Sequence, residues 1–359
     1  MTLRVAQWAT GAVGREAVLG VLGAPGLELV AVKVHGSDKV GVDAGELVGL
    51  PPLGVRTTQD LAELLAAAPD CVVYTPRVAH VAEVADLLRA GVDVVTTAFC
   101  FHPARMSAAD RAVLEQAAYA GGATLHGSGL NPGNFGMAVP LALSGLVREL
   151  RTVSLVERAD WSAYESTRIT FDNMRFGAPP AQVDEGASEF LAFNADLFRQ
   201  QVWLIGDALG AELDEVVTEH SVGTATEPIP VFDRTIAPGT VNAQRWTWTG
   251  RARGTAKVVV DCLWSIGAAP ADWPRAQHGW TVQLEGEPSV QAHLTTLASF
   301  AEPRSLADHV RAASAATAMQ VVNAIPAVCA AAPGFATAES LPLVRSLQGF
   351  RPAVAAAGA

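Results

Sequence analysis

The sequence contains little cysteine, little tyrosine and little positive charge for its length. Among 359 residues there are 4 Cys and 3 Tyr, and 25 Lys and Arg stand against 36 Asp and Glu, for a formal net charge of −11. No two cysteines are close enough along the chain to form a Cys-x-x-Cys motif, which excludes that class of zinc and redox sites. An acidic chain that also lacks long runs of Lys and Arg does not have the charge pattern of a nucleic-acid-binding protein.

Long hydrophobic runs are missing as well. No uninterrupted apolar stretch reaches the roughly 18 residues of a membrane span, and the N-terminus has no apolar segment followed by a small-residue cleavage site. We therefore expect a cytoplasmic protein with reduced thiols and without a membrane partner. The chain does contain 50% hydrophobic and only 17% charged residues, which is typical of folded domains with a large core.

Strand-like and helix-like segments alternate over the first 135 residues. Short apolar runs at 71–74 and 93–96 are each followed by a segment with apolar residues at helical spacing. Glycines follow these helical segments, as is usual after a helix C-terminus, and Ser107 with Asp110 fits a capping box at the start of one of them. This alternation predicts β-α-β units and a parallel sheet.

The pattern changes after Pro132-Gly133. A long helical stretch at 180–209 lies among several β-like segments, and a further helix is expected at 305–325, ended by Pro326. The β-like segments lie at 150–158, 212–223, 240–249, 255–266 and 279–285. We therefore predict an α/β protein in which an N-terminal parallel sheet is followed by an α+β domain with a mixed or antiparallel sheet.

The turn between the first strand and the first helix carries a phosphate-binding pattern. It reads Ala9-Thr10-Gly11-Ala12-Val13-Gly14, which is G-x-G-x-x-G with Ala9 in place of the first glycine. Gly11 lets the backbone approach a pyrophosphate, Gly14 lets the helix pack on the strand, and the helix N-terminus offers amides to the phosphates. The motif predicts a dinucleotide site; the alternative is an ordinary tight turn between strand and helix.

The end of the second strand bears on the choice of dinucleotide. An NAD site usually has a carboxylate there for the ribose 2′-hydroxyl, whereas this strand ends at His35, followed by Ser37 and Lys39. A hydroxyl and an ammonium suit a 2′-phosphate, so the charge argument favours NADP(H). NAD(H) remains possible, because Asp38 would favour it if its carboxylate turned inward.

Four blocks of sequence, at 7–11, 37–47, 125–129 and 318–327, resemble those of a known family. They are similar to the dihydrodipicolinate reductase-like family that contains 2,4-diaminopentanoate dehydrogenase and the native amine dehydrogenases, and the resemblance extends over about residues 3–345. It implies a Rossmann domain at 1–135, completed by a C-terminal helix at about 303–345. It also implies an α+β substrate-binding domain at 136–302 that closes over the nicotinamide and forms a homodimer. The implied reaction is NAD(P)H-dependent reduction of a C=O or C=N bond.

One departure from the family follows the fifth strand. The amine dehydrogenases place a glutamate there that assists imine formation and binds ammonia, but residues 96–103 of this chain read Thr-Thr-Ala-Phe-Cys-Phe-His-Pro. The missing acid calls amination by free ammonia into question and leaves hydride transfer to a carbonyl or a preformed imine unaffected. The His-His motif of dihydrodipicolinate reductase is also missing at the matching position, which argues against a role in lysine biosynthesis.

Further cofactor contacts are expected where the parallel strands end, because ligands of open α/β sheets lie beyond the carboxyl ends of the strands. The candidates are Thr75, Pro76, Arg77, Thr97, Ala98 and Asn131. Plain turns are the alternative for the first five. For Asn131 the alternative is a hinge between domains, where Asn serves the turn geometry.

The proton that balances hydride addition has three candidate sources or helpers. His102 lies in the loop without the glutamate, Tyr164 carries a hydroxyl, and Arg158 would polarise the carbonyl oxygen beside it. For His102 the alternative is an ordinary surface histidine. Tyr164 is expected on one side of a helical turn with Trp161, and the alternative for this pair is packing in the domain core. The expected substrate contacts, which favour a small hydrophobic ketone or imine, are Phe99, Phe101, Asn134, Trp161 and Phe171.

Three functions agree with these observations. The first is an NADPH-dependent oxidoreductase that reduces a small carbonyl or imine. The second is a catalytically silent NADP(H) sensor, which the missing glutamate favours and the complete second domain disfavours. The third is an amine dehydrogenase in which Asp160 or Glu165 replaces the lost acid.

Overall fold

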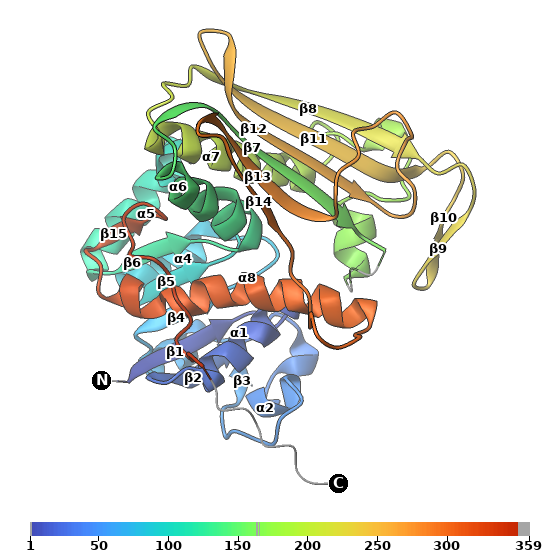
Figure 1. The fold of residues 1–359 in the computed structure, drawn as a ribbon. Helices are drawn as coiled ribbons and strands as arrows, with labels where there is room; N and C mark the ends of the chain where they lie inside the picture. Colours follow the sequence, from blue (N-terminus) through green and yellow to red (C-terminus); the bar gives the residue numbers. More distant parts are fainter. Residues whose placement is uncertain (1, 163, 165, 351–359) are drawn as a thin grey trace. The chain divides into compact units, whose positions relative to one another are not determined.

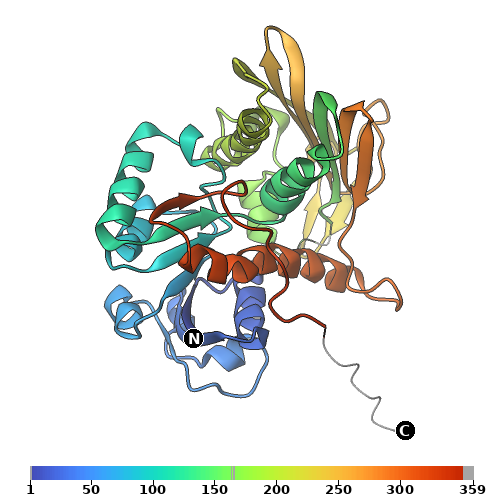
Figure 2. The same ribbon diagram turned by 60° about the vertical axis from the view of Figure 1, so that its left-hand side comes forward.

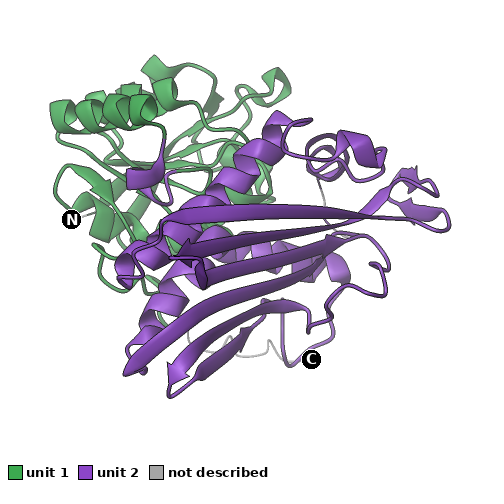
Figure 3. Ribbon diagram, turned by 90° about the horizontal axis from the view of Figure 1, so that it is seen from above, with its two compact units in different colours: residues 1–99, 107–129, 317–359 green, residues 100–106, 130–316 purple. Residues whose placement is uncertain are grey.

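The chain folds into two compact units in the computed structural model, which describes residues 2–162, 164 and 166–350 (Figure 3). Unit 1 consists of residues 1–99, 107–129 and 317–359, and unit 2 consists of residues 100–106 and 130–316. The chain therefore enters unit 2 after residue 129, whereas the sequence pattern placed the change at residue 135. The segment 100–106 and the first part of the C-terminal helix also belong to unit 2.

Unit 1 is built on a seven-stranded sheet in which all neighbouring strands are parallel. The strand order is β15-β6-β5-β4-β1-β2-β3. Its strands are β1 (Leu3–Trp8), β2 (Leu27–Lys33), β3 (Thr57–Thr58), β4 (Cys71–Tyr74), β5 (Asp93–Thr96), β6 (Thr124–Gly127) and β15 (Gly334–Ala336). Parallel neighbours need crossover helices, so this sheet agrees with the alternating pattern of the sequence.

Helices connect and cover these strands (Figures 1 and 2). They are α1 (Ala12–Gly23), α2 (Ala44–Leu47), α3 (Leu61–Ala66), α4 (Val81–Arg89), α5 (Ala108–Gly121) and the second part of α8 (Leu306–Cys329). Apolar residues of α1 and α8 form one core cluster with residues of β1, β2, β4 and β5. The predicted cap of α5 is present, because Ser107 Oγ accepts a hydrogen bond from the amide of Asp110 at 3.1 Å.

The helix α8 is unusually apolar. Its length and composition would allow it to cross a membrane. Its most apolar 18 residues have a mean hydropathy of 1.3, and 33% of these residues are buried. Residues from Ala318 to Val328 contribute to the core of unit 1, which accounts for the apolar character of the second part of the helix. The prediction that Pro326 ends the helix is wrong, because the helix continues to Cys329. A proline removes one backbone hydrogen bond, and the last turn tolerates this loss here.

Unit 2 is built on a six-stranded sheet with the order β14-β13-β7-β12-β11-β8. The β7–β12 pair is parallel, and the other neighbours are antiparallel. The strands are β7 (Glu149–Asp160), β8 (Glu215–Thr224), β11 (Val241–Ala252), β12 (Thr255–Ser265), β13 (Gly279–Glu287) and β14 (Val290–Leu294). A mixed sheet was predicted, and the fold class is confirmed.

Shorter elements and two helices complete unit 2. They are η2 (Pro103–Arg105), η3 (Leu130–Ala138), α6 (Val139–Ser144), η4 (Arg168–Asn173), η5 (Pro180–Gln182), α7 (Glu189–Ala208) and the hairpin of β9 (Ile229–Val231) and β10 (Arg234–Ile236). The core lies between α7 and one face of the sheet. Val153 and Leu155 of β7 point into this core, so alternation places Glu157 on the same face and Arg158 on the other.

Candidate functional site

The phosphate-binding turn of unit 1 has the geometry that its sequence predicts. A β-carbon on Gly14 would lie 2.1 Å from the carbonyl oxygen of Ala9, so the close approach of helix to strand requires glycine there. A β-carbon on Gly11 would meet nothing within 4 Å, which leaves open space beside the backbone at the start of α1. Ala9 itself has φ +75°, the left-handed conformation that glycine adopts most easily.

The N-terminus of α1 is suited to a phosphate ligand. Its N-cap residue, Gly11, has no side chain to accept hydrogen bonds from the first amides, and the first turn contains no acidic residue. These amides and the positive end of the helix dipole therefore suit an anion. Thr10 is buried at the end of the turn, and Ala12 and Val13 begin the helix.

A buried glutamine holds the turn in place. Gln7 Nε2 donates to the carbonyl oxygen of Ala9 at 2.8 Å and to Thr75 Oγ1 at 2.7 Å. Thr75 Oγ1 also donates to the carbonyl oxygen of Trp8 at 3.2 Å. The loop after β4, which continues through buried Pro76 to exposed Arg77, is therefore fastened to the turn after β1. This arrangement brings Thr75 and the glycine turn together, as the cofactor prediction requires.

The end of β2 presents a mixture of charges. Ser37, Asp38 and Lys39 form a short 3-10 helix, η1, and His35 is exposed just before it. Asp38 Oδ1 lies 2.3 Å from the position that a β-carbon on Gly36 would take, so this carboxylate folds back over the end of the strand. Although His35 is exposed, partial loss of hydration and the positive charges of Lys33 and His80 lower its pKa, against the opposing effect of Glu83.

The loop after β5 carries the remaining cofactor candidates of unit 1. Ala98 is buried, and its amide donates to Thr96 Oγ1 at 3.0 Å, while Thr97 is partly exposed. The prediction for Asn131 concerns unit 2, where it lies in η3 and donates from Nδ2 to Glu157. None of these contacts identifies a ligand, so the cofactor roles of these residues stay predictions.

His102 lies in a polar cluster of unit 2. Its residue exposure is 7%, and its Nε2 lies 2.9 Å from Asp207 Oδ2 on α7. Arg105 donates to both oxygens of the same carboxylate and stacks on the ring of Trp203. Partial burial raises the pKa of Asp207, but hydrogen bonds from His102 and Arg105 outweigh it and lower the pKa overall. The Asp207 carboxylate therefore fixes the orientation of the His102 ring, and histidine is a residue type that can serve as a general acid.

Tyr164 stacks on Trp161, with ring centroids 4.7 Å apart. Trp161 in turn contacts Phe176 and Trp264 of the core. The helical turn expected for this pair is wrong, because Tyr164 and Trp161 are joined by a turn outside any helix. Burial raises the pKa of Tyr164, so its hydroxyl keeps its proton and can donate it.

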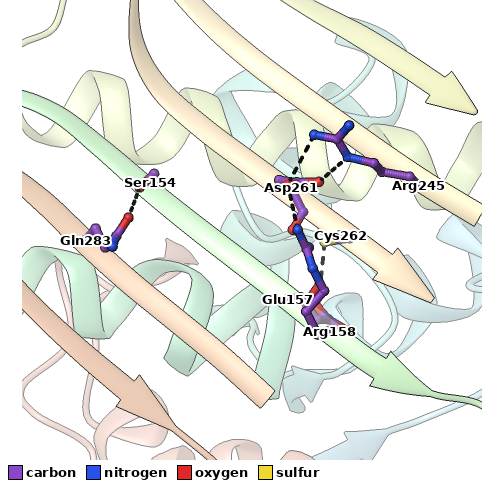
Figure 4. A network of polar contacts seen from close by, with 7 residues as sticks. All are labelled: Ser154, Glu157, Arg158, Arg245, Asp261, Cys262 and Gln283. Atoms are coloured by element: carbon purple, nitrogen blue, oxygen red, sulfur yellow. Dashed lines mark hydrogen bonds and ion pairs between the residues drawn. The ribbon is translucent and has the colours of Figure 1, made fainter. Parts of the chain in front are cut away.

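Arg158 points away from this pair. Its guanidinium donates to Asp261 Oδ2 at 2.9 Å on the opposite face of the sheet, where Arg245 reaches the same carboxylate at 3.0 Å (Figure 4). The side chains of Arg158 and Asp261 are 8% and 13% exposed. The expectation that Arg158 polarises a carbonyl beside Tyr164 is therefore wrong, because strand alternation places Arg158 on the face opposite the core that Trp161 contacts.

The expected substrate contacts fall in both units. Phe99 is buried in unit 1, whereas Phe101 and Phe171 are buried in unit 2, where Asn134 is partly exposed on η3. Phe171 and Trp161 share the core between α7 and the sheet, and the guanidinium of Arg234 lies over the Phe171 ring at 4.9 Å. A role in packing accounts for these contacts, and their role in substrate binding stays a prediction.

The comparisons with known proteins agree with this fold. Residues 8–119 match the family described as dihydrodipicolinate reductase, N-terminus, and residues 138–355 match the 2,4-diaminopentanoate dehydrogenase C-terminal domain. An amine dehydrogenase from Streptomyces virginiae is 32% identical over 356 residues, which cover 94% of this chain and 95% of that protein. The chain belongs to the dihydrodipicolinate reductase-like family that includes the amine dehydrogenases.

Two solved structures share the fold of this chain. The amine dehydrogenase from Mycobacterium smegmatis has a TM-score of 0.75 and 23% identity, covering 96% of this chain and 97% of that one. GenD2 from gentamicin A biosynthesis, solved in complex with NAD, has a TM-score of 0.52 and 17% identity, covering 94% and 90%. The chain is an NAD(P)-dependent oxidoreductase, and the open space at Gly11 and the uncapped N-terminus of α1 fit such a cofactor.

Two buried or paired carboxylates, those of Glu157 and Asp207, were not among the site residues predicted from the sequence. Glu157 is 8% exposed and accepts a hydrogen bond from Trp264 Nε1 at 2.9 Å, and Asp207 pairs with His102. Glu157 was detectable, since an acid on the apolar side of an alternating strand is unusual. Asp207 was not, because it lies 105 residues from His102.

Proposed function

We propose that this oxidoreductase transfers hydride from NADPH, in preference to NADH, to the C=O or C=N bond of a small hydrophobic ketone or imine. The single observation that carries the proposal is the phosphate-binding turn, in which Gly14 is required for packing and Gly11 leaves open space. Membership of a family whose members include an amine dehydrogenase supports the reaction class.

The reduced nicotinamide supplies the hydride, and the chain's own residues bind the cofactor and provide the proton. The amides at the start of α1 bind the pyrophosphate, and Gln7 holds the turn in shape. His102, whose ring is oriented by Asp207, or Tyr164, kept protonated by its burial, donates a proton to the reduced oxygen or nitrogen.

The preference for NADPH rests on the positive charge near the end of β2. Lys33 and Lys39 belong to this region, and His35 adds positive charge to it as the pH falls, whereas an NAD site would place a carboxylate at the strand end. The folded-back carboxylate of Asp38 supports NAD(H) as the second possibility. The two cofactors differ only in the 2′-phosphate, so their relative affinity measures this region directly.

A titration of the protein with NADPH and with NADH, followed by the fluorescence of the reduced nicotinamide, tests the proposal. We expect saturable binding of both, with the lower dissociation constant for NADPH. A panel of small carbonyl and imine compounds, with and without ammonia, then tests turnover. Binding without turnover of any compound would favour the sensor function, and no binding of either cofactor would refute the oxidoreductase proposal.

The remaining expectations concern assembly and location. We propose that the protein acts in the cytoplasm as a homodimer, with a small molecule rather than a nucleic acid or a membrane as its partner. The dimer follows from the family resemblance, and light scattering after size-exclusion chromatography measures it. A monomeric mass at micromolar concentration would contradict the homodimer.

A further inference from the structure

Glu157 is a buried acid among neutral partners in unit 2. Its carboxylate accepts hydrogen bonds from Asn131 Nδ2 and from Trp264 Nε1. The thiol of Cys262 lies 3.7 Å from the same carboxylate (Figure 4). None of the ion pairs among the described residues involves Glu157. A buried carboxylate is normally paired with a cation, so this site lacks the partner that its charge calls for.

Asn131 also carries a buried acceptor oxygen, and a second lies on Gln201, the other amide beside Gly136. Asn131 donates from Nδ2 to Glu157, which leaves its Oδ1 buried and without a partner. Gln201 of α7 is fully buried and donates from Nε2 to the carbonyl oxygen of Gly136, while its Oε1 has no partner among the described residues. A β-carbon on Gly136 would lie 2.4 Å from Asn131 Oδ1 and 2.6 Å from Gln201 Nε2, so the two amides flank the same glycine.

The surroundings of this polar group are aromatic. Trp264 contacts Trp161 and Phe198, with ring centroids 6.0 and 5.8 Å apart. Acceptor oxygens beside a carboxylate and aromatic rings suit a compact cation with several N–H donors. Asn131 is partly exposed, so the group is not sealed inside the core.

We propose that Glu157, with Asn131 beside it, binds the protonated nitrogen of an ammonium ion, an iminium substrate or the primary amine product. This inference rests on the proposed function and names the nitrogen-binding acid of that site. It assigns to β7 the carboxylate that the loop after β5 does not provide. Asp160 does not compete for this role, because alternation places it with Arg158 on the opposite face, and Glu165 lies outside the described residues.

The reaction balances with the groups named. An ammonium ion and the carbonyl compound condense with loss of one water to give an iminium ion. The iminium would then accept the hydride that the reduced nicotinamide supplies, which gives the neutral amine and the oxidised cofactor. Glu157 accepts hydrogen bonds from the nitrogen throughout and stabilises its positive charge. The carboxylate exchanges no proton in these steps and is free to bind the next ammonium ion when the amine leaves.

Thermal unfolding of the whole protein tests the site without turnover. Ammonium chloride and n-butylammonium chloride are compared with sodium chloride at equal ionic strength, in the wild type, in Glu157→Gln and in the control Glu149→Gln. Glu149 begins the same strand and is exposed. We expect the ammonium salts to raise the Tm of the wild type and of the control above the sodium chloride value, and not that of Glu157→Gln.

Steady-state kinetics gives a second measurement. Loss of a charged hydrogen bond predicts at least a tenfold higher KM for ammonia in Glu157→Gln, while the dissociation constant for NADPH stays unchanged. If Glu157→Gln does not fold, Glu157→Asp replaces it, since it keeps the charge and withdraws the carboxylate by one methylene. The same rise in KM is expected.

The outcomes separate this inference from the proposed function. A wild type that binds NADPH and reduces carbonyls, but shows no ammonium-specific change in Tm and no dependence on ammonia, overturns the inference alone. An ammonium response that survives in both Glu157 variants also overturns it. A wild type that binds neither NADPH nor NADH refutes the proposed function, whatever the ammonium response.

Discussion

Ala9 and Gly14 meet so closely that a β-carbon on Gly14 would lie 2.1 Å from the carbonyl oxygen of Ala9. Gly11, three residues earlier, has open space around the same position. The two glycines of one motif therefore serve different purposes. Gly14 is needed for the fold, and Gly11 is needed only if a ligand approaches the backbone.

Gly14→Ala is expected to lower the free energy of unfolding by about 2 kcal/mol or more, because the new methyl group forces the turn apart. Gly11→Ala is the matched control and should leave that free energy nearly unchanged. Gly11→Ala should instead raise the dissociation constant for NADPH, since its methyl group occupies space needed by the pyrophosphate. Denaturant unfolding and cofactor fluorescence measure the two effects. Unchanged cofactor affinity in Gly11→Ala would show that the turn is merely structural.

Lys39→Ala is expected to weaken NADPH binding more than NADH binding, because only NADPH carries the 2′-phosphate. Parallel titrations of both cofactors measure the difference. Equal effects on the two dissociation constants would remove Lys39 from the phosphate site.

The preference for the phosphorylated cofactor should depend on pH through His35. Burial, Lys33 and His80 hold the pKa of His35 below its usual value of 6.5, and Glu83 opposes them. His35 is therefore largely neutral at pH 7 and gains its charge only as the pH falls further. The ratio of the dissociation constants of NAD⁺ and NADP⁺, measured at about pH 6 and about pH 8, should favour NADP⁺ more at the lower pH. His35→Gln should reduce this change, and it controls for titration of the phosphate itself.

His102→Gln should lower kcat at least about 100-fold if His102 donates the proton, with the dissociation constant for NADPH unchanged. Asp207→Asn should lower kcat less, because the His102 ring then loses the carboxylate that orients it. Tyr164→Phe tests the other donor in the same assay. An unchanged kcat in either substitution eliminates that residue as the donor.

Arg158→Met should destabilise unit 2 without affecting the chemistry. Removing one partner of a buried ion pair costs about 3 kcal/mol, because Asp261 keeps a charge that only Arg245 then compensates. We expect the loss in denaturant unfolding and an unchanged dissociation constant for NADPH. A fall in kcat with unchanged stability would restore the catalytic role.

Glu157 should make the stability of the wild type fall as the pH rises. Burial raises the pKa of Glu157 above 4.5, although hydrogen bonds from Trp264 and Asn131 oppose the shift. The folded state then binds more protons than the unfolded state between 4.5 and the raised pKa, so the free energy of unfolding decreases across that interval. Glu157→Gln removes this pH-dependent contribution to the free energy of unfolding. Its stability relative to the wild type should therefore improve from about pH 4 to about pH 8, measured by denaturant unfolding.

Local patterns in the sequence were enough for most of the alternating strands and helices of unit 1, although they did not reveal the short strands β3 and β15. The strands at 71–74 and 93–96 were placed at their observed bounds, and the cap formed by Ser107 and Asp110 was recognised. The glycine turn was also identified. Each of these features depends on residues within a few positions of one another, where side-chain spacing and backbone preferences are visible in the chain itself.

Side-chain partnerships between distant elements required the folded structure. His102 and Asp207 meet across 105 residues, and Arg158 finds Asp261 across 103 residues. The segment 157–164 contained the acid, the arginine and the aromatic pair, but the sequence did not show which face of the strand each would occupy. Packing of α7 against the sheet determined this, because it buries Glu157 with Asn131 and leaves Arg158 on the other face. The sequence by itself therefore determined which charged and hydroxyl side chains are present. Only the tertiary structure decided the partner of each side chain, because these contacts join residues far apart in the chain.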